Sequence, residues 1–550
     1  KLVFNKDGEI TEEGLRLLEF KSMGYVSYLR GENPITFPLR LTPSMLINKN
    51  GTKMFPLYST HNDVSIILKH KSPRLNIVGG TIQKKDVFTF LELFGSTLSG
   101  LQDIVYQQAI QNMIDSSPDL DLNARGEKNS IVDNVLLTQI TDFVFPLDSS
   151  DVKQQLKDKT LNVEDFYGSS GLKNSMNRKG KTYSYKKHCP PFFDRDFIKD
   201  YSCKMASILD AVDNSDGIVF IYTNYVDSGI IPLQLMLEHN GYRRYDKRKL
   251  LSFPEYKSSL DKHTCKREPI SYNGLQKSKA GDDFKQSCFM VIDGTTNKKE
   301  LAEQLNVVTS KTNSNGERIK IILGTVVASE GLDFKRIRSI HILDPWLHLN
   351  RIEQTIGRGI RFCSHADLPP THKNVLTYLH TSLLSDGRET IDTSIYRYAE
   401  KKSLQIGMVE TILKKNAIDR HLYENVNVIS KGSLYKTLVQ PAIIHSNTMN
   451  VDPTDKAYSK VCSYMPECDY NKDLSVDYDI SLNKDTFIDS YSKNAIHNVK
   501  QKIALLFHEF YVFRLESILG LMNEYGFSYN EMIYRALSEM ISEKYTICSK

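Results

Sequence analysis

Two arginines three residues apart, Arg358 and Arg361, are the side chains in this sequence best suited to chemistry. They lie behind Gly357 in the stretch "NRIEQTIGRGIRF", residues 350–362. Arginine stays charged and presents a planar fork of donors that matches phosphate oxygens. A spacing of three places both guanidinium groups on one face of a helix, and the glycine beside them allows a ligand to approach closely. The pattern predicts a phosphate-binding helix face; the alternative is a surface helix whose arginines pair with carboxylates.

The surrounding sequence predicts an α/β fold with a parallel sheet that would position these arginines. Continuous apolar runs, typical of strands covered on both faces, occur at 217–223, 288–294, 318–325, 339–345 and 374–380. Segments with helical spacing separate them, as at 201–213, 230–241 and 298–308. Because the arginines follow the strand at 339–345, we expect them near the carboxyl edge of the sheet, where such folds bind ligands.

The chain is predicted to divide into six segments. An interlobe segment with short strands at 1–60 precedes a helical and irregular insertion at 61–200, with a helix expected over 83–115. The sheet-bearing lobe is expected at 201–400 and a helical extension at 401–446. A polar linker at 447–495 then leads to a helical or winged-helix module at 496–550.

Composition limits the possible partners and compartments. The net charge of the 550 residues is only +5, so a nucleic-acid site must be a local patch. The longest apolar runs are too short to cross a bilayer, and no secretory signal opens the chain. The eight cysteines include no Cys-x-x-Cys pair, which predicts reduced thiols, a cytosol-like compartment and no structural metal. The first residue is Lys1, which suggests a piece of a longer protein.

Two motifs resemble those of a known family, the second RecA-like lobe of superfamily-2 helicases and translocases. The stretch "TVVASEGLD" at 325–333 is similar to motif V, and "QTIGRGIR" at 354–361 is similar to motif VI. The stretch "IVFIYTN" at 218–224 lies where motif IV would be. Longer passages resemble helicases of large cytoplasmic DNA viruses, including the poxvirus-type transcription and termination ATPases and their giant-virus relatives; these passages are 21–40, 217–245 and 342–370.

The resemblance implies roles around a nucleotide. Arg361 would be the finger that reaches the γ-phosphate of ATP, and Arg358 would support phosphate contact or closure of the cleft. Gln354 would face the cleft, and Gly331 and Asp333 would line its nucleotide side together with the glycine before the first arginine.

The resemblance also implies a nucleic-acid track. Thr325 of the motif V stretch would contact the nucleic-acid backbone, and Thr223 belongs to the motif IV stretch on the same track. Arg243 and Arg244 lie in a basic loop, residues 242–249, whose five cations and two tyrosines are suited to a phosphate backbone. A solvated loop without a ligand is the alternative for 242–249.

A working enzyme of this family also needs a phosphate cradle, which the sequence does not offer. Backbone amides and a lysine in a Gly-x-x-x-x-Gly-Lys-Ser/Thr loop hold the phosphates, and an acidic box manages Mg²⁺. Gly180, Lys181 and Thr182 give the right triplet, but Ser175 replaces the earlier glycine and no apolar strand precedes it. We therefore expect ATP and Mg²⁺ to be held mainly by a first lobe absent from this chain, in cis or in trans. The chain alone is expected to hydrolyse ATP negligibly.

Together these patterns predict the C-terminal portion of an ATP-dependent helicase or translocase, viral and linked to transcription. Its expected partners are DNA or RNA, the missing lobe and RNA polymerase, and its expected location is the cytoplasm, in a virus factory, or the virion. The alternative is a non-catalytic RecA-like scaffold that docks onto nucleic acid or a polymerase. Salt-dependent nucleic-acid binding without linkage to ATP would favour that alternative.

Overall fold

The computed structural model has two compact units, residues 1–471 and 472–550. The residues that the structure describes are 3–5, 8–34, 36–46, 64–67, 74–116, 131–147, 152–158, 162–252, 287–294, 296–329, 331–429, 440–444, 447–470, 493–527 and 530–547.

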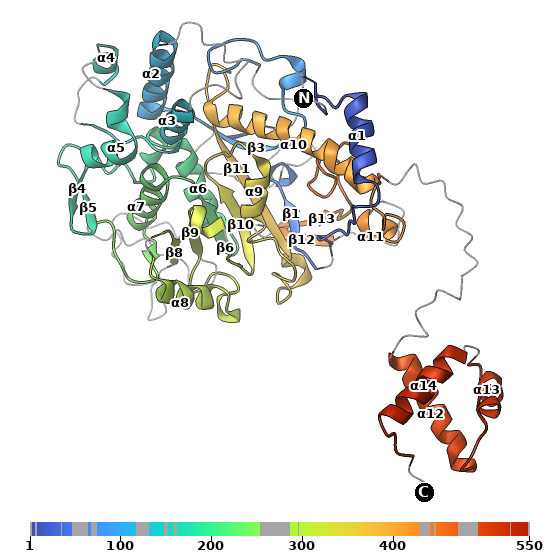
Figure 1. Ribbon diagram of the computed structural model, residues 1–550. Coiled ribbons are helices and arrows are strands. Elements are labelled where there is room, and N and C mark those ends of the chain that lie inside the picture. The colour runs from blue at the N-terminus through green and yellow to red at the C-terminus, as the bar shows by residue number, and fades with distance from the viewer. Residues whose placement is uncertain are drawn as a thin grey trace. The chain divides into compact units, whose positions relative to one another are not determined.

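A mainly parallel sheet forms the centre of the first unit (Figure 1). Its described strands follow the order β2, β3, β11, β10, β6, β9, β8, β7, with β1 beside β11, and only β2 pairs antiparallel. Their bounds are β1 Leu39–Leu41, β2 Val64–Ile67, β3 Leu93–Thr97, β6 Ile218–Tyr222, β7 Arg243–Arg244, β8 Cys288–Ile292, β9 Ile321–Gly324, β10 Ile337–Ile342 and β11 Asn374–Leu383. The predicted α/β fold with a parallel sheet is therefore confirmed.

Helices cover both faces of this sheet, as the continuous apolar strands require. Along β6, Val219 and Ile221 pack into one core cluster, whereas Ile218 and Phe220 pack into another on the opposite face. Helices α6 and α7 belong to the first cluster, and α8, α9 and α10 to the second. The helices of the unit are α1 Glu12–Ser22, α2 Gly100–Ser116, α3 Ile131–Asp142, α4 Val152–Lys157, α5 Gly168–Ser175, α6 Cys203–Asn214, α7 Ile231–His239, α8 Lys298–Val308, α9 Leu349–Ile356, α10 Ile391–Lys415 and α11 Glu424–Asn427.

The sheet is not confined to residues 201–400. Strands β1 and β3, from the first hundred residues, pair with β11 in parallel. The helix predicted over 83–115 is wrong in its first half, because Leu93–Thr97 forms strand β3 and helix α2 begins only at Gly100. The predicted linker at 447–495 also contains a strand, since β13 (Asn447–Val451) pairs with β12 (Gln440–Ile444).

A buried cluster of charges connects three helices to the sheet. Lys204 of α6 is fully buried, and its Nζ lies 2.7 Å from Asp142 Oδ1 at the end of α3 and 2.9 Å from Asp392 Oδ2 at the start of α10. The Asp392 carboxylate also accepts hydrogen bonds from the Thr141 hydroxyl at 2.8 Å and the Ser382 backbone N–H at 3.0 Å. Burial raises the pKa of Asp142, whereas the two carboxylates raise the pKa of Lys204 against its own burial.

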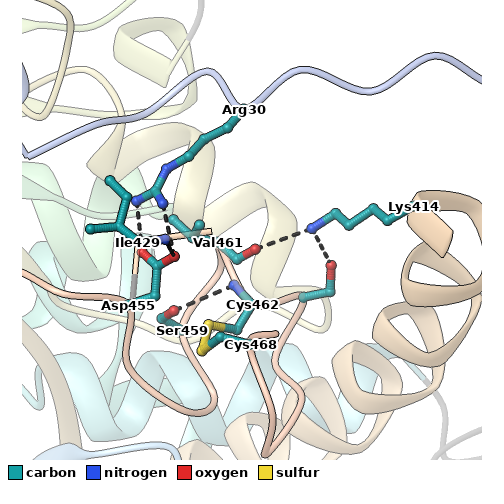
Figure 2. The surroundings of a disulfide bond; sticks show 9 residues. Arg30, Lys414, Ile429, Asp455, Ser459, Val461, Cys462 and Cys468 are labelled. Atoms are coloured by element: carbon teal, nitrogen blue, oxygen red, sulfur yellow. Dashed lines mark hydrogen bonds and ion pairs between the residues drawn. A yellow bond between two sulfur atoms is a disulfide. The ribbon is translucent and has the colours of Figure 1, made fainter. Parts of the chain in front are cut away.

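A disulfide joins Cys462 and Cys468 beside the end of α10, so the prediction that all thiols are reduced is wrong (Figure 2). The chain between the two cysteines turns sharply, with positive φ at Ser463 and Tyr464, and this brings their Cα atoms to 4.5 Å. That separation suits a disulfide, but polar sequence around the pair gives no sign of it. Lys414 fixes the loop by donating to the Val461 carbonyl at 3.1 Å and the Ser463 hydroxyl at 2.7 Å.

We expect Gly407→Ala to separate this disulfide loop from α10. A Cβ at Gly407 would meet the Ser463 carbonyl oxygen at 1.8 Å, a backbone atom that cannot rotate away. The variant should therefore lower the free energy of unfolding, by about 1–3 kcal/mol as overpacking does elsewhere. Thermal unfolding measures this, with Gly520→Ala as the control. Gly520 lies in the helix Leu515–Glu524, and nothing lies within 4 Å of a Cβ built at this residue. A melting temperature unchanged by Gly407→Ala would contradict the packing described.

The second unit, residues 472–550, contains helices α12 Lys493–Glu509, α13 Leu515–Glu524 and α14 Asn530–Ser542. They enclose their own small core, which includes Val499, Met522 and Ile533. Between 493 and 547 the regular elements described are all helices, so the strands of a winged helix are not found within that stretch. Across the part of the chain that the structure describes, no helix has the length and apolarity needed to span a membrane.

Candidate functional site

Helix α9 ends just before the two arginines, which contradicts the prediction that they share a helical face. Gly357 caps α9, donating its N–H to the Glu353 carbonyl at 2.8 Å. Gly359 then lets the chain pass close to the sheet, because a Cβ there would meet Ile340 Cδ1 at 3.0 Å and Ile337 Cβ at 3.2 Å. Two glycines in three residues disfavour helix continuation, so Arg358 and Arg361 lie in the turns that follow.

The arginines meet the segment that leads into β10. Arg358 Nη1 and Arg361 Nη1 approach the Leu332 carbonyl at 3.3 and 3.5 Å, and Arg361 also forms an ion pair with Asp333. The Phe334 N–H donates to the Arg358 carbonyl at 3.1 Å, which fixes this contact through the backbone. The structure therefore brings together the predicted finger Arg361, the predicted supporting Arg358 and the predicted nucleotide-side carboxylate of Asp333.

The pair formed by Arg361 and Asp333 is accessible to solvent. Their side chains are 43% and 66% exposed, and exposed ion pairs stabilise a fold by only about 0–1 kcal/mol. A phosphate could therefore replace the carboxylate beside Arg361 at little cost. Gly331, with φ of +69°, is exposed and has nothing within 4 Å of a Cβ, so the backbone conformation is what requires glycine there. Gln354 is exposed on the last turn of α9.

This cluster lies at the amino end of β10, and the expected position at the carboxyl edge is wrong. His365 Nε2 lies 2.7 Å from the carbonyl of Ile337, the first residue of β10, which places the whole turn at that end. Helix α9 follows β10 and returns the chain along the sheet, as the helix of a parallel crossover must. The prediction was wrong because the arginines follow helix α9, which brings the chain from the carboxyl end of β10 back to its amino end.

The two predicted threonines lie at the opposite, carboxyl end of the sheet. Thr223 follows β6 and Thr325 follows β9, and the Thr223 N–H donates to the Gly324 carbonyl at 3.1 Å. Both threonines are buried, and Thr223 Oγ1 already accepts from the Tyr225 N–H at 3.2 Å. Thr223 therefore shapes the loop after β6, and exposed neighbours would have to make any contact with a ligand.

Arg243 and Arg244 lie away from both groups, on the edge strand β7. They pair with the first two residues of β8, Cys288 and Phe289, at the amino end of that strand. Arg244 donates to Asp246 Oδ2 and to Gln234 Oε1, both at 2.9 Å, whereas Arg243 is exposed. The four predicted nucleic-acid residues therefore do not form one continuous surface, because the two arginines lie apart from the two threonines.

Asp344, which the sequence analysis did not single out, organises the carboxyl end of the sheet. It follows β10, is 1% exposed, and accepts hydrogen bonds from the Asn224 N–H at 2.8 Å and from the Asn224 side-chain amide. Burial raises the pKa of Asp344 to about 6. A small hollow beside it is lined by Tyr222, Asn224, Ile342, Asp344, Trp346, Arg351, Ile352 and Thr355. An acidic residue directly after a buried strand, as in "ILDPW", was the available signal.

Asp344→Asn is expected to remove a pH dependence of stability. Because the pKa of Asp344 is raised above its ordinary value of 3.8, the folded state holds a proton that the unfolded state has released. Stability from this proton is complete below about pH 4 and is lost as the pH rises through about 6. Urea unfolding at several pH values should show this fall in the wild type and not in the variant. If the free energy of unfolding changes with pH to the same extent in both proteins, the raised pKa of Asp344 is contradicted.

Within the described residues, no three His, Cys, Asp or Glu side chains gather as a metal site. Gly180, Lys181 and Thr182 lie in the turn of a hairpin between β4 (Met176–Lys179) and β5 (Thr182–Tyr185). A P-loop, by contrast, joins a strand to a helix. Of the residues that the sequence predicts around a nucleotide, the structure thus brings together Arg358, Arg361 and Asp333.

A parallel sheet covered by helices, with paired arginines after the helix that follows β10, is the arrangement expected of a second RecA-like lobe of the helicase type. Residues 233–363 match the family described as the helicase conserved C-terminal domain. The matched residues extend from α7 to the turn after the arginines.

Parts of the chain are similar to helicases of large DNA viruses. It is 25% identical to a protein described as an ATP-dependent RNA helicase of Acanthamoeba polyphaga mimivirus, over 75% of this chain and 40% of that protein. A second mimivirus protein with the same description is 30% identical, over 42% of this chain and 35% of its own length. A termination factor NPH-I homolog of African swine fever virus is 29% identical, over 40% and 33%. The chain thus spans two fifths or less of the length of each of these relatives.

Proposed function

We propose that this chain is the C-terminal part of a viral ATP-dependent helicase or translocase that acts in transcription. The contact of Arg358 and Arg361 with Leu332 and Asp333 supports this proposal most strongly, because it presents two permanent cations at an accessible place. The viral helicases and the termination factor similar to this chain support the link to nucleic acid and transcription. RNA polymerase is the proposed partner, and the cytoplasm the proposed location.

The residues present fit the phosphate end of ATP. Arg361 would offset charge on the transferred phosphate, Arg358 would support phosphate contact from beside the same Leu332 carbonyl, and Gln354 would face the cleft. Gly331, Asp333 and the helix cap Gly357 would form the nearby wall. When bound, ATP with Mg²⁺ supplies the phosphoanhydride bond and the charge that the arginines stabilise. The Asp333 carboxylate pairs with Arg361 in this wall.

The phosphate cradle is proposed to belong to a first lobe outside this chain, in cis or in trans. The 550-residue chain alone should therefore hydrolyse ATP negligibly, with or without nucleic acid. A coupled assay for ADP release tests this, with the full-length gene product as the active comparison. Turnover by the chain alone that Arg361→Ala abolishes would contradict the proposal.

Thr325 and Thr223 are proposed to belong to the nucleic-acid end of the lobe. Because both are buried, we expect them to act by fixing the loops after β9 and β6, from which exposed groups contact the backbone. Arg243 and Arg244 are proposed as a separate phosphate-binding segment at the edge of the sheet.

A further inference from the structure

The stretch of sequence that has the most cations without an acidic residue lies outside the arginine site. Between residues 166 and 193 the sequence has no Asp or Glu, and it has six cations, Lys173, Arg178, Lys179, Lys181, Lys186 and Lys187. This run exceeds the net charge of +5 for all 550 residues. It contains the β4–β5 hairpin and has no role in the site described above.

The hairpin holds three of these cations, Arg178, Lys179 and Lys181, at a defined turn. Its strands pair Arg178 with Tyr183 and Lys179 with Thr182, around Gly180 at φ +62°. Arg178 Nε donates to the Gly180 carbonyl at 3.2 Å, and the Thr182 hydroxyl donates to the Lys179 carbonyl at 3.1 Å. The tip is therefore built by its own hydrogen bonds, with Lys179 and Lys181 exposed on it.

The two faces of the hairpin differ in chemistry. Met176 and Tyr183 are buried in the main core, with Tyr185 packed against them. Alternation along paired strands places a different set on the outward face, Asn177, Lys179, Thr182 and Ser184. Amide, hydroxyl and ammonium groups are the donors that proteins direct to phosphate oxygens. This face has no aromatic side chain on which an unpaired base could stack.

The hairpin adjoins the second basic segment, residues 242–249. The Tyr183 N–H donates to the Leu250 carbonyl at 2.7 Å, and the Ser252 N–H donates to the Tyr183 carbonyl at 2.7 Å. Strand β5 therefore runs beside the residues that directly follow this loop, in which Arg243 and Lys247 are exposed. Figure 1 shows the hairpin at the margin of the first unit, on the far side from α1.

We propose that the β4–β5 hairpin and loop 242–249 together bind the phosphate backbone of double-stranded nucleic acid without regard to sequence. This inference rests on the proposed function and deepens it, by naming a duplex as the substrate form and a contact surface outside the helicase motifs. A duplex presents phosphates and keeps its bases stacked, which matches a face of amide, hydroxyl and ammonium donors without aromatic rings, next to the exposed Lys181 of the turn. An acidic protein partner fits less well, since this face also offers no apolar side chain to bury.

The test compares duplex binding by the full-length gene product and by two triple variants. Lys179, Lys181 and Lys187 change to Gln in the hairpin variant, and Lys21, Lys401 and Lys415, on α1 and α10, change to Gln in the control. Fluorescence anisotropy with a 20-base-pair duplex of arbitrary sequence gives the logarithm of the association constant as a function of the logarithm of the salt concentration. Three lost phosphate contacts should reduce the slope by about 2–3 in the hairpin variant, and the control should keep the wild-type slope. Melting temperatures check folding, and Lys→Arg at the same three positions should retain binding.

The outcomes separate this inference from the proposed function. Duplex binding by the wild type with an unchanged slope in the hairpin variant overturns the inference and leaves the proposed function standing. Failure of the wild-type protein to bind any duplex or single strand overturns the proposed function as well. A larger loss for a 20-nucleotide single strand than for the duplex overturns the assignment of substrate form. Unchanged duplex binding with loss of an acidic protein partner would assign the hairpin to protein binding and also overturns it.

Discussion

Arg361→Ala in the full-length protein is expected to reduce nucleic-acid-stimulated ATP hydrolysis by about 10³-fold or more. The guanidinium lies at an accessible place beside Leu332 and Asp333, and it is 43% exposed. Its loss leaves the charge of the transferred phosphate without a permanent cation. We expect kcat to fall while duplex affinity stays close to that of the wild type, because the proposed nucleic-acid contacts lie elsewhere.

Two further variants make this result specific. Arg361→Lys should recover only part of the rate, because an ammonium group cannot reproduce the planar fork of donors. Arg16 is exposed on α1, away from the site, and Arg16→Ala removes one positive charge there. This variant should hydrolyse ATP at the wild-type rate. If Arg361→Ala keeps the wild-type rate, the lobe is a scaffold and not a catalytic partner.

Lys204→Met is expected to lower the free energy of unfolding of the 550-residue chain by about 3–5 kcal/mol. Lys204, Asp142 and Asp392 have fully buried side chains, so the change leaves two carboxylates without their cation. Methionine has a similar length, which limits any effect of lost packing. Urea unfolding can be followed through Trp346, the single tryptophan of this chain.

The pH dependence distinguishes a charge effect from a packing effect. Burial already raises the pKa of Asp142, and without Lys204 its carboxyl will take up a proton more readily. The difference between variant and wild type should therefore shrink as the pH falls. A difference that is constant with pH would indicate lost packing only. Lys415→Met, exposed in the last turn of α10, should change stability by less than about 0.5 kcal/mol.

Strands β6, β8 and β9 could be predicted because each is a continuous apolar run, buried on both faces apart from the half-buried Cys288. β10 is fully buried too, although it also contains Arg338, Ser339 and His341. Helix α8 occupies the predicted residues 298–308, since Asn297 caps it and its apolar residues recur at helical spacing. β3 was missed because a short strand of five residues is fixed by its neighbours β2 and β11 and not by its own pattern.

The residues of the arginine cluster could be chosen from the sequence, but their place in the fold could not. The spacing of Arg358 and Arg361 identified them as a pair, yet the helix ends at Gly357, before both arginines. The position of the turn that carries them depends on the close packing of Gly359 against Ile337 and Ile340. Asp344 was not predicted because its role depends on the hydrogen bonds that it accepts from Asn224, 120 residues away in the sequence. The disulfide of Cys462 depends in the same way on the turn between the cysteines.

The segment from Thr325 to Phe334 joins the two ends of the lobe. Thr325 lies at the carboxyl end of β9, whereas Leu332 and Asp333 hold the arginines at the amino end of β10. The described residues of this stretch, 325–329 and 331–334, lead from one end of the strands to the other. Both ends are fixed by hydrogen bonds, from the Thr325 N–H to the Ile292 carbonyl and from the Phe334 N–H to the Arg358 carbonyl. Under the proposed function, we therefore expect a displacement of Asp333 from Arg361 to be transmitted to the loop after β9, which would couple the phosphate end of the lobe to its nucleic-acid end.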